Sequence, residues 1–286
     1  MLASLTGKTV RNEGIRGETA QTIAARMGAA KINLSGPFNL AAKGGSSAYI
    51  YGDNIKDEYG ADVAPRELTE SWTNVLIGGV RGKLSGLTNT NDNPRRLNSA
   101  LFTRTLSGEV INLTSAESME ITTGASFVRG DINVIFVGQN GWDDGSGYCR
   151  GNGTAESENI DGLINIIDRM IANTGDPNKC IIVGRMSGNA SANLANYTDA
   201  ESAMAAKYGD RFMNMREYLS NETNLAKVGI TATETDKENI ASGSLPQSLW
   251  ASASGTIDKV HLNANGYRLF AQGIYEKLIA LNLINN

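Results

Sequence analysis

Two short runs of apolar residues constrain the fold of this chain more than any other feature. They cover residues 132–137 (INVIFV) and 179–184 (KCIIVG), and residues 156–173, with apolar positions at helical spacing, lie between them. Strands that are apolar on both sides and alternate with helices are typical of a parallel sheet covered on both faces. We therefore predict an α/β fold built on a doubly wound parallel sheet.

The same alternation extends toward both ends of the chain. Residues 8–12 resemble a strand, a glycine-containing turn follows, and residues 19–27 have helical spacing with Thr19 as the N-cap. Residues 2–7 resemble the end of a helix. The remaining elements are expected as helices at about 195–207 and 264–281 and a short strand near 211–215.

The middle of the chain has a different character. Between about residues 31 and 130, short alternating runs of β-forming residues are separated by Gly, Asn, Asp and Ser, without a long helical pattern. With 286 residues, the chain is long for one average domain but short for two. We predict an α/β core of residues 1–30 and 131–286 that carries a β-rich inserted domain at 31–130.

Composition and charge exclude several classes of function. Lys plus Arg number 26 against 30 Asp plus Glu, with no basic run, so we expect no binding to nucleic acid through its phosphates. No apolar run approaches the roughly 18 to 20 residues that span a bilayer, so no membrane span is expected. The first residues contain no apolar stretch of signal-peptide length, and an extracellular or a cytoplasmic location both remain open.

Histidine and cysteine are scarce in this sequence. His261 is the only histidine, and Cys149 and Cys180 are the only cysteines, so we expect no structural zinc site. No motif calls for a cofactor. Pairing of the two cysteines and the oligomeric state are left open. Any catalysis by an imidazole must use His261.

Three predicted loops carry groups suited to acyl transfer. Asp258 precedes His261 by three residues, so its carboxylate can accept the Nδ1–H and leave Nε2 as a general base toward a serine hydroxyl. The side-chain amide of Asn140, after the strand at 132–137, can donate to a developing oxyanion, and the N–H of Gly17 could be a second donor. Taken singly, Asn140 could cap its turn and Gly17 could be an ordinary turn glycine.

At these positions the sequence resembles the SGNH (GDSL-type) esterases and lipases. The resemblance covers residues 1–30 and 131–286 and rests on three blocks in the family's order. Residues 12–19 (NEGIRGET) are similar to the second block, Gly138-Gln139-Asn140-Gly141 to the third with Gly141 in place of the usual Asp, and Asp258-Lys-Val-His261-Leu-Asn, followed by Gly266-Tyr267, to the fifth.

The resemblance implies a fold and a function. The fold would be of SGNH type, and the activity would be hydrolysis of O-acyl esters, in particular O-acetyl esters on small molecules or carbohydrates, through an acyl-serine intermediate. His261 would be the base, Asp258 would orient it, and Gly17 and Asn140 would stabilise the oxyanion. Candidate substrate contacts are Gln139, Trp142 and Arg16, although Trp142 could equally pack its own loop.

The family's serine nucleophile belongs to a G-D-S motif after the first strand, and this sequence contains no such motif. Ser4 lies too close to Gly17 for a strand–helix–strand unit, which takes about 30 residues. The serine is therefore expected upstream of Met1. Two alternatives remain open: a binding module that recognises a glycan or a receptor without turnover, and a truncated product with no function of its own.

Overall fold

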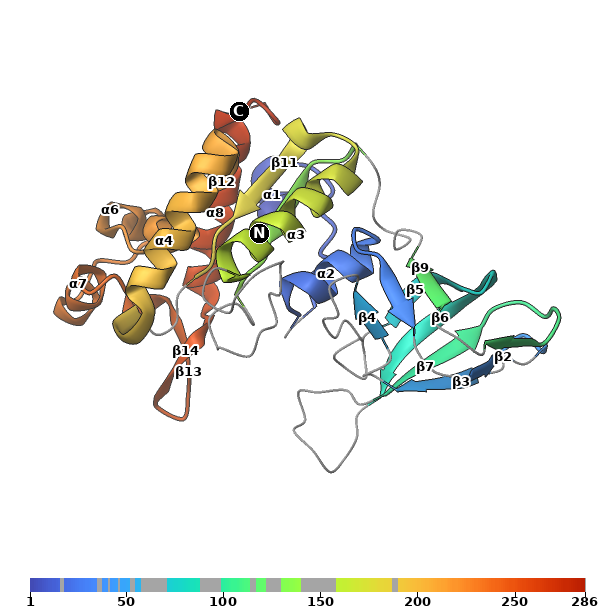
Figure 1. Ribbon diagram of the computed structural model, residues 1–286. Coiled ribbons are helices and arrows are strands. Elements are labelled where there is room, and N and C mark those ends of the chain that lie inside the picture. The colour runs from blue at the N-terminus through green and yellow to red at the C-terminus, as the bar shows by residue number, and fades with distance from the viewer. Residues whose placement is uncertain are drawn as a thin grey trace. The chain divides into compact units, whose positions relative to one another are not determined.

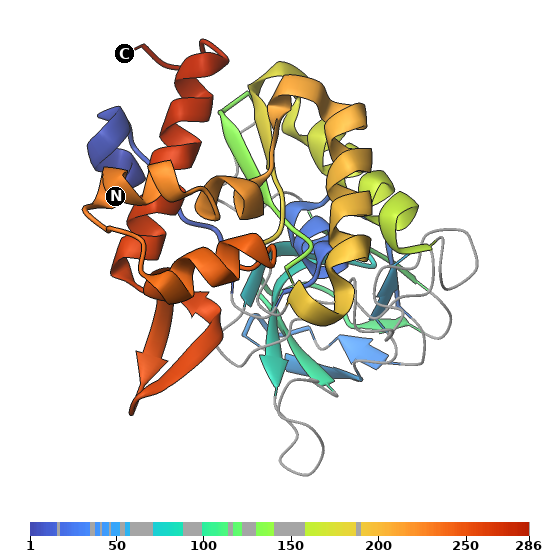
Figure 2. The same ribbon diagram turned by 90° about the vertical axis from the view of Figure 1, so that its left-hand side faces the viewer.

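The protein is described from a computed structural model (Figures 1 and 2). The described residues are 1–15, 18–34, 38–40, 42–45, 47–51, 55–57, 71–87, 99–113, 117–121, 130–139, 158–186 and 190–285. They belong to two compact units, the first formed by 1–12, 132–139 and 178–286, the second by 13–131 and 140–177. The chain combines helices and strands, in agreement with the α/β class, and the domain boundaries expected from the sequence stay a prediction.

A parallel sheet forms the centre of the first unit. Its strands lie in the order β10 (Asn133–Phe136), β11 (Cys180–Val183), β12 (Phe212–Met213), and both neighbouring pairs are parallel. Every residue of β11 is buried, as expected for a strand with neighbours on both sides. The helices of this unit are α1 (Leu2–Thr6), α4 (Ala190–Tyr208), α5 (Met215–Leu219), α6 (Glu222–Leu225), α7 (Glu234–Ala241) and α8 (Ala264–Ala280), with short 3-10 turns at Gly209–Arg211, Ala226–Val228 and Gln247–Leu249.

Helix α8 packs on this sheet through its apolar side. Leu269, Ile274 and Leu278 are buried in one cluster with Ile181 and Met213 of the strands. The approach is close: a Cβ added at Gly273 would lie 2.4 Å from the Cε of Met213. The final helix predicted from the sequence therefore forms part of the main core of this unit.

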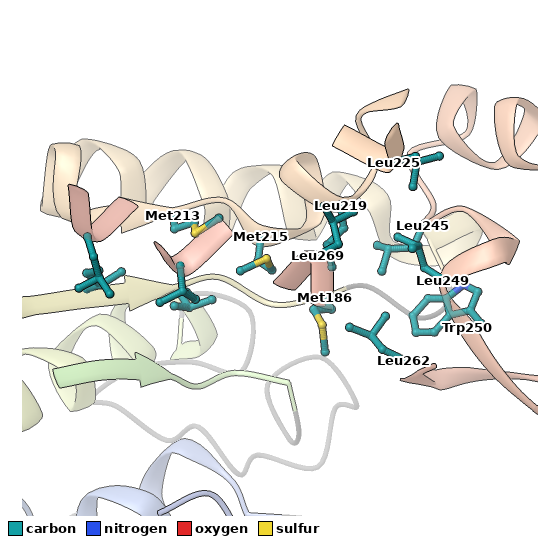
Figure 3. Packing of buried hydrophobic residues seen from close by; sticks show 14 of the residues in the cluster. Met186, Met213, Met215, Leu219, Leu225, Leu245, Leu249, Trp250, Leu262 and Leu269 are labelled. Atoms are coloured by element: carbon teal, nitrogen blue, oxygen red, sulfur yellow. The ribbon is translucent and has the colours of Figure 1, made fainter. Parts of the chain in front are cut away.

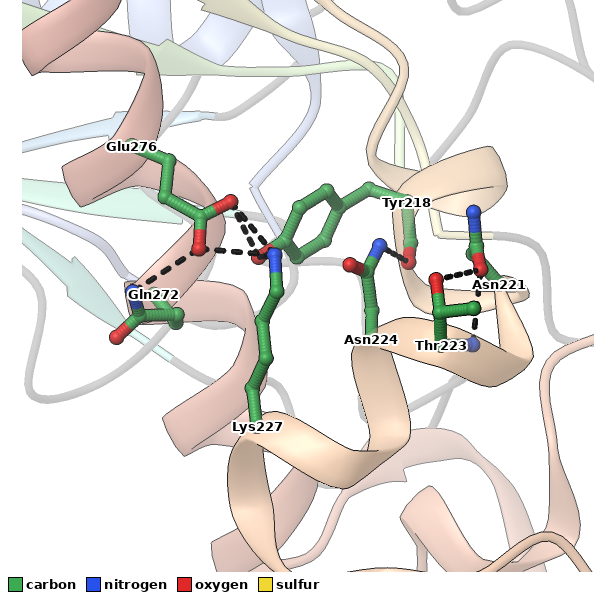
Figure 4. Close-up of polar contacts among 7 residues, drawn as sticks. All are labelled: Tyr218, Asn221, Thr223, Asn224, Lys227, Gln272 and Glu276. Atoms are coloured by element: carbon green, nitrogen blue, oxygen red, sulfur yellow. Dashed lines mark hydrogen bonds and ion pairs between the residues drawn. The ribbon is translucent and has the colours of Figure 1, made fainter.

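A group of polar contacts ties α8 to the segment from α5 to the 3-10 turn Ala226–Val228 (Figure 4). The ammonium of Lys227 lies 2.9 Å from both carboxylate oxygens of Glu276, and the hydroxyl of Tyr218 donates to Glu276 at 3.0 Å. Burial and the hydrogen bond to Glu276 raise the pKa of the Tyr218 phenol. Asn221 caps α6 by accepting the N–H of Thr223. These contacts account for the position of α6, which the sequence pattern did not predict.

An antiparallel sheet of seven strands forms most of the second unit, in the order β3-β7-β6-β5-β9-β1-β4. A second, two-stranded sheet pairs β2 with β8. The strands are β1 (Ile32–Leu34), β2 (Phe38–Leu40), β3 (Ser47–Tyr51), β4 (Ile55–Asp57), β5 (Ser71–Ile77), β6 (Val80–Leu87), β7 (Ser99–Arg104), β8 (Ile111–Leu113) and β9 (Glu117–Ile121). Their buried side chains, including Trp72, Leu84 and Phe102, form one apolar cluster.

The β5–β6 hairpin shows how local sequence sets this sheet. Gly78 and Gly79 connect the two strands, and both have positive φ, 53° and 78°. A two-residue turn with positive φ at both positions suits the right-handed twist of paired strands, and glycine adopts this conformation without a steric penalty. The Gly-Gly pair therefore fixes the pairing of Ile77 with Val80.

Two helices belong to the second unit, α2 (Ala20–Met27) and α3 (Glu158–Thr174). The sequence-based prediction of Thr19 as the N-cap of α2 is confirmed, because its side chain accepts the N–H of Thr22. Asn173 of α3 donates to the carbonyl of Met27 at 2.7 Å, which joins the C-terminal ends of the two helices.

The prediction of a strand at residues 8–12 is wrong. These residues have no regular secondary structure and are exposed, with Val10 43% exposed. An extended segment becomes a strand only when another strand pairs with its N–H and C=O groups. None of the described strands pairs with 8–12, so the residue types of this segment were not sufficient to make it a strand.

Leu84→Ala is expected to destabilise the second unit by about 2–5 kcal/mol, because Leu84 is fully buried in the apolar cluster and its removal leaves a cavity. Leu106→Ala is the matched control: this leucine of the same unit is 72% exposed, and its loss should change the free energy of unfolding by no more than about 0.5 kcal/mol. Urea denaturation of both variants measures the difference, and equal effects would contradict the packing described.

Candidate functional site

The Asp258–His261 segment lies in a β-hairpin of the first unit. Strands β13 (Trp250–Ala253) and β14 (Thr256–Leu262) are antiparallel and joined by Ser254 and Gly255, both with positive φ. The sequence-based expectation of a loop directly before the last helix is therefore corrected. The segment is part of β14, because residues on both sides of it pair with β13.

The register of this hairpin contains a jump. Leu262 pairs with Trp250, whereas Asp258 pairs with the next residue of β13, Ala251. Residues 259–261 lie between these two pairs and have no counterpart on β13, so they bulge out of the ladder. This bulge explains how side chains three residues apart in a strand can meet, since a regular strand would point them to opposite faces.

The carboxylate of Asp258 closes the bulge. Its Oδ2 lies 2.6 Å from Nδ1 of His261, and its Oδ1 accepts the backbone N–H groups of Val260 at 2.8 Å and of His261 at 3.2 Å. An ionised carboxylate has no proton to donate, so we assign the proton of this contact to Nδ1. The hydrogen bond from His261, followed by that from the N–H of Val260, lowers the pKa of the Asp258 carboxyl.

The imidazole is accessible. The side chain of His261 is 66% exposed and that of Asp258 is 37% exposed. Among the described residues, no group is hydrogen-bonded to Nε2 of His261. An ion pair at such an exposed position contributes little to stability. The arrangement can instead hold one tautomer of the imidazole and present Nε2 to a proton donor from outside.

Of the other predicted site residues, Gln139 lies within the described part of the chain. It is half-buried, and its Oε1 accepts the backbone N–H of Met186 at 3.0 Å. This bond joins the loops that follow β10 and β11. Among the described contacts, Gln139 therefore has a structural partner and does not bond to Asp258 or His261, and its role in substrate binding stays a prediction.

The remaining predicted site residues lie outside the described residues: Arg16, Gly17, Asn140 and Trp142. The proposed oxyanion donors and two of the three candidate substrate contacts therefore stay predictions. The structure brings together Asp258 and His261 and leaves the rest of the predicted constellation untested.

Sequence reasoning missed a second group of residues that supports the hairpin. Asp236 is fully buried and accepts hydrogen bonds from Thr233 and from Ser248. Asn263, directly after β14, caps α8 by accepting the N–H of Gly266 at 3.0 Å. Two signals could have found them: the Thr-x-x-Asp pattern of a capping box at 233–236, and an Asn immediately before a helical segment.

Comparison with known proteins adds no further information. No family model matches the chain, and neither the curated proteins nor the solved structures contain a significant match. In the part of the chain that the structure describes, no helix has both the length and the apolar character needed to cross a membrane. The same residues contain no group of three or more His, Cys, Asp or Glu side chains placed to hold a metal ion.

His261→Ala is expected to raise the pKa of the Asp258 carboxyl toward its ordinary value, because the largest cause of its lowering is the hydrogen bond from the imidazole. The carboxyl ¹³C resonance of Asp258, followed through a pH titration, measures the change. Glu276 is an internal control: burial acts to raise its pKa, but hydrogen bonds, first among them that from Lys227, lower it, and these bonds do not involve His261. An unchanged titration of Asp258 would contradict the assigned contact.

Proposed function

We propose that this protein is a serine esterase of SGNH type that hydrolyses O-acyl esters through an acyl-serine intermediate. The observation that carries the proposal is the 2.6 Å contact between Nδ1 of His261 and Oδ2 of Asp258, with the imidazole open to solvent. A carboxylate that holds the Nδ1–H tautomer leaves Nε2 unprotonated, which is the state a general base requires.

The position of the pair within its unit also supports the proposal. Active sites of α/β proteins gather at the carboxyl ends of parallel strands. Met186, three residues beyond the carboxyl end of β11, is buried in the same cluster as Leu262 and Trp250 (Figure 3). Leu262 directly follows His261 in the chain, so this cluster connects the hairpin to the carboxyl edge of the parallel sheet.

In the proposed reaction, Nε2 of His261 removes the proton of a serine hydroxyl as the serine oxygen attacks the ester carbonyl. The carboxylate of Asp258 stabilises the imidazolium that forms. Collapse of the tetrahedral intermediate breaks the bond to the leaving alcohol, which receives the proton from Nε2. Water, deprotonated in turn by Nε2, then attacks the acyl-serine. The second tetrahedral intermediate collapses, the serine oxygen leaves and takes back the proton from Nε2, and the acid is released.

The remaining parts of this mechanism rest on the resemblance. The proposed nucleophile is the serine of the family's G-D-S motif, and the backbone N–H of Gly17 and the amide of Asn140 are the proposed oxyanion donors. O-acetyl esters, free or on carbohydrates, are the proposed substrates. Arg16, Gln139 and Trp142 are the proposed substrate contacts.

A second candidate function is a binding module that keeps the site but does not turn over its ligand. Such a module would bind a glycan or a receptor with equal affinity whether or not His261 is present.

In a protein that carries the proposed serine nucleophile, His261→Ala is expected to lower kcat/KM for p-nitrophenyl acetate and for acetylated xylo-oligosaccharides by about 10²–10⁴-fold, because it removes the general base. Lys259→Ala is the matched control, since Lys259 is an exposed neighbour in the same bulge that lies outside the proposed machinery, and its kcat/KM should stay within about twofold.

Two results would overturn the esterase proposal. One is hydrolysis that survives His261→Ala. The other is a pair of findings on a protein that carries the serine nucleophile. It does not turn over the O-acyl esters tested, and it binds acetylated glycans with the same affinity as its His261→Ala variant. The second result would instead establish the binding module.

A further inference from the structure

The side chain of Asn263 holds the C-terminal end of the bulge that carries Asp258 and His261. The Nδ2 group of Asn263 donates to the carbonyl of Ser248 at 2.8 Å and to that of Trp250 at 3.1 Å. Its Oδ1 accepts the N–H of Gly266 in the first turn of α8. One amide therefore fixes the end of β14 both to the start of β13 and to helix α8.

Close packing leaves little space for this junction to move. A Cβ added at Gly266 would lie 2.6 Å from the carbonyl oxygen of Leu249, so the first turn of α8 lies directly against the chain before β13. The backbone N–H of Asn263 also donates to that same carbonyl at 2.9 Å. Leu262, between His261 and Asn263, is 3% exposed and buried in the apolar cluster.

The segment to which Asn263 bonds is itself anchored by Asp236. The Oδ1 of this carboxylate accepts the N–H of Ser248 at 2.9 Å, and Oδ2 accepts the Ser248 hydroxyl at 2.6 Å. Oδ2 also accepts the N–H and the hydroxyl of Thr233. Burial acts to raise the pKa of Asp236, but these hydrogen bonds outweigh it and the pKa is lowered. An ionised, fully buried carboxylate with four hydrogen bonds has few alternative positions.

We propose that Asn263 is a positioning residue for His261, and that Asp236 anchors it through Ser248. The chain of contacts runs from the buried carboxylate to Ser248, from the Ser248 carbonyl to Asn263, and from Asn263 to the bulge two residues earlier. The inference deepens the proposed esterase function, on which its kinetic consequence rests. Its structural consequence, a fixed Asp258–His261 contact, does not depend on any activity.

The decisive variant is Asn263→Ser. Serine is as good an N-cap as asparagine, so α8 keeps its cap, but serine cannot donate to both carbonyls of Ser248 and Trp250. The matched control is Asn221→Ser. Asn221 caps α6 by accepting the N–H and the hydroxyl of Thr223, and among the described residues its amide nitrogen has no acceptor. Both variants therefore replace a capping Asn by a capping Ser, and only the first removes the two tethering hydrogen bonds.

Two readouts separate positioning from stability. In Asn263→Ser the carboxyl pKa of Asp258, followed by ¹³C NMR below the unfolding temperature, should rise toward its ordinary value, because the contact with His261 loosens. If the protein hydrolyses p-nitrophenyl acetate, kcat should fall by about 10- to 100-fold with little change in KM. Asn221→Ser should leave the titration of Asp258 and kcat unchanged.

Ser248→Ala is the milder variant, since it removes the Ser248 hydroxyl and keeps its backbone bonds to Asp236 and Asn263. It should move the pKa of Asp258 in the same direction by a smaller amount, and it covers the case in which Asn263→Ser does not fold. Unchanged titration of Asp258 in the folded variants overturns the inference, whatever the activity. Absence of ester turnover in a protein that carries the serine nucleophile, together with a raised pKa of Asp258, overturns the proposed function and leaves the inference standing.

Discussion

Three consecutive residues of β14, 259–261, have no partner on β13 although the residues on both sides of them are paired. The two pairs that enclose them use adjacent residues of β13, Trp250 and Ala251. The ends of the bulge are therefore held close together, and the side chain of Asp258 can reach back to the imidazole of His261. The candidate site depends on this local mismatch between two strands.

Buried hydrogen bonds hold the bulge in place, and the contact between Asp258 and His261 is not one of them. The contact between Asp258 and His261 is exposed and contributes little to the free energy of folding. The buried polar groups of the same unit are different in kind. Asp236 accepts four hydrogen bonds, two of them from Ser248, whose carbonyl accepts the amide of Asn263. A rigid, buried support beneath an exposed pair is the arrangement that a preorganised base requires.

Much of the fold could be predicted from short-range patterns. The apolar runs gave β10 and β11, the helical spacing gave α2, α3 and α8, and Thr19 marked the start of α2. Two features could not be predicted in the same way: that residues 8–12 do not form the expected strand, and that β13 and β14 form a hairpin. Pairing depends on residues distant in sequence, and the residue types at 8–12 do not say whether a second strand is present beside them.

The candidate site was predictable to a similar extent. The three-residue spacing and the single histidine identified Asp258 and His261, because only local geometry was needed. Asp236 and Ser248 escaped notice, because their connection to the site runs through contacts between segments 12 and 15 residues apart. The expected oxyanion donors, Gly17 and Asn140, lie outside the described residues and stay predictions.

The tautomer of His261 tests the central claim most directly. The chain has one histidine, so its two imidazole ¹⁵N resonances need no assignment between residues. At a pH where the ring is neutral, the account predicts a protonated, pyrrole-type Nδ1 and an unprotonated, pyridine-type Nε2, because the Asp258 carboxylate accepts the Nδ1–H. A protonated Nε2 with a bare Nδ1 would contradict the account, since the imidazole would then be neither oriented by Asp258 nor able to act as a base.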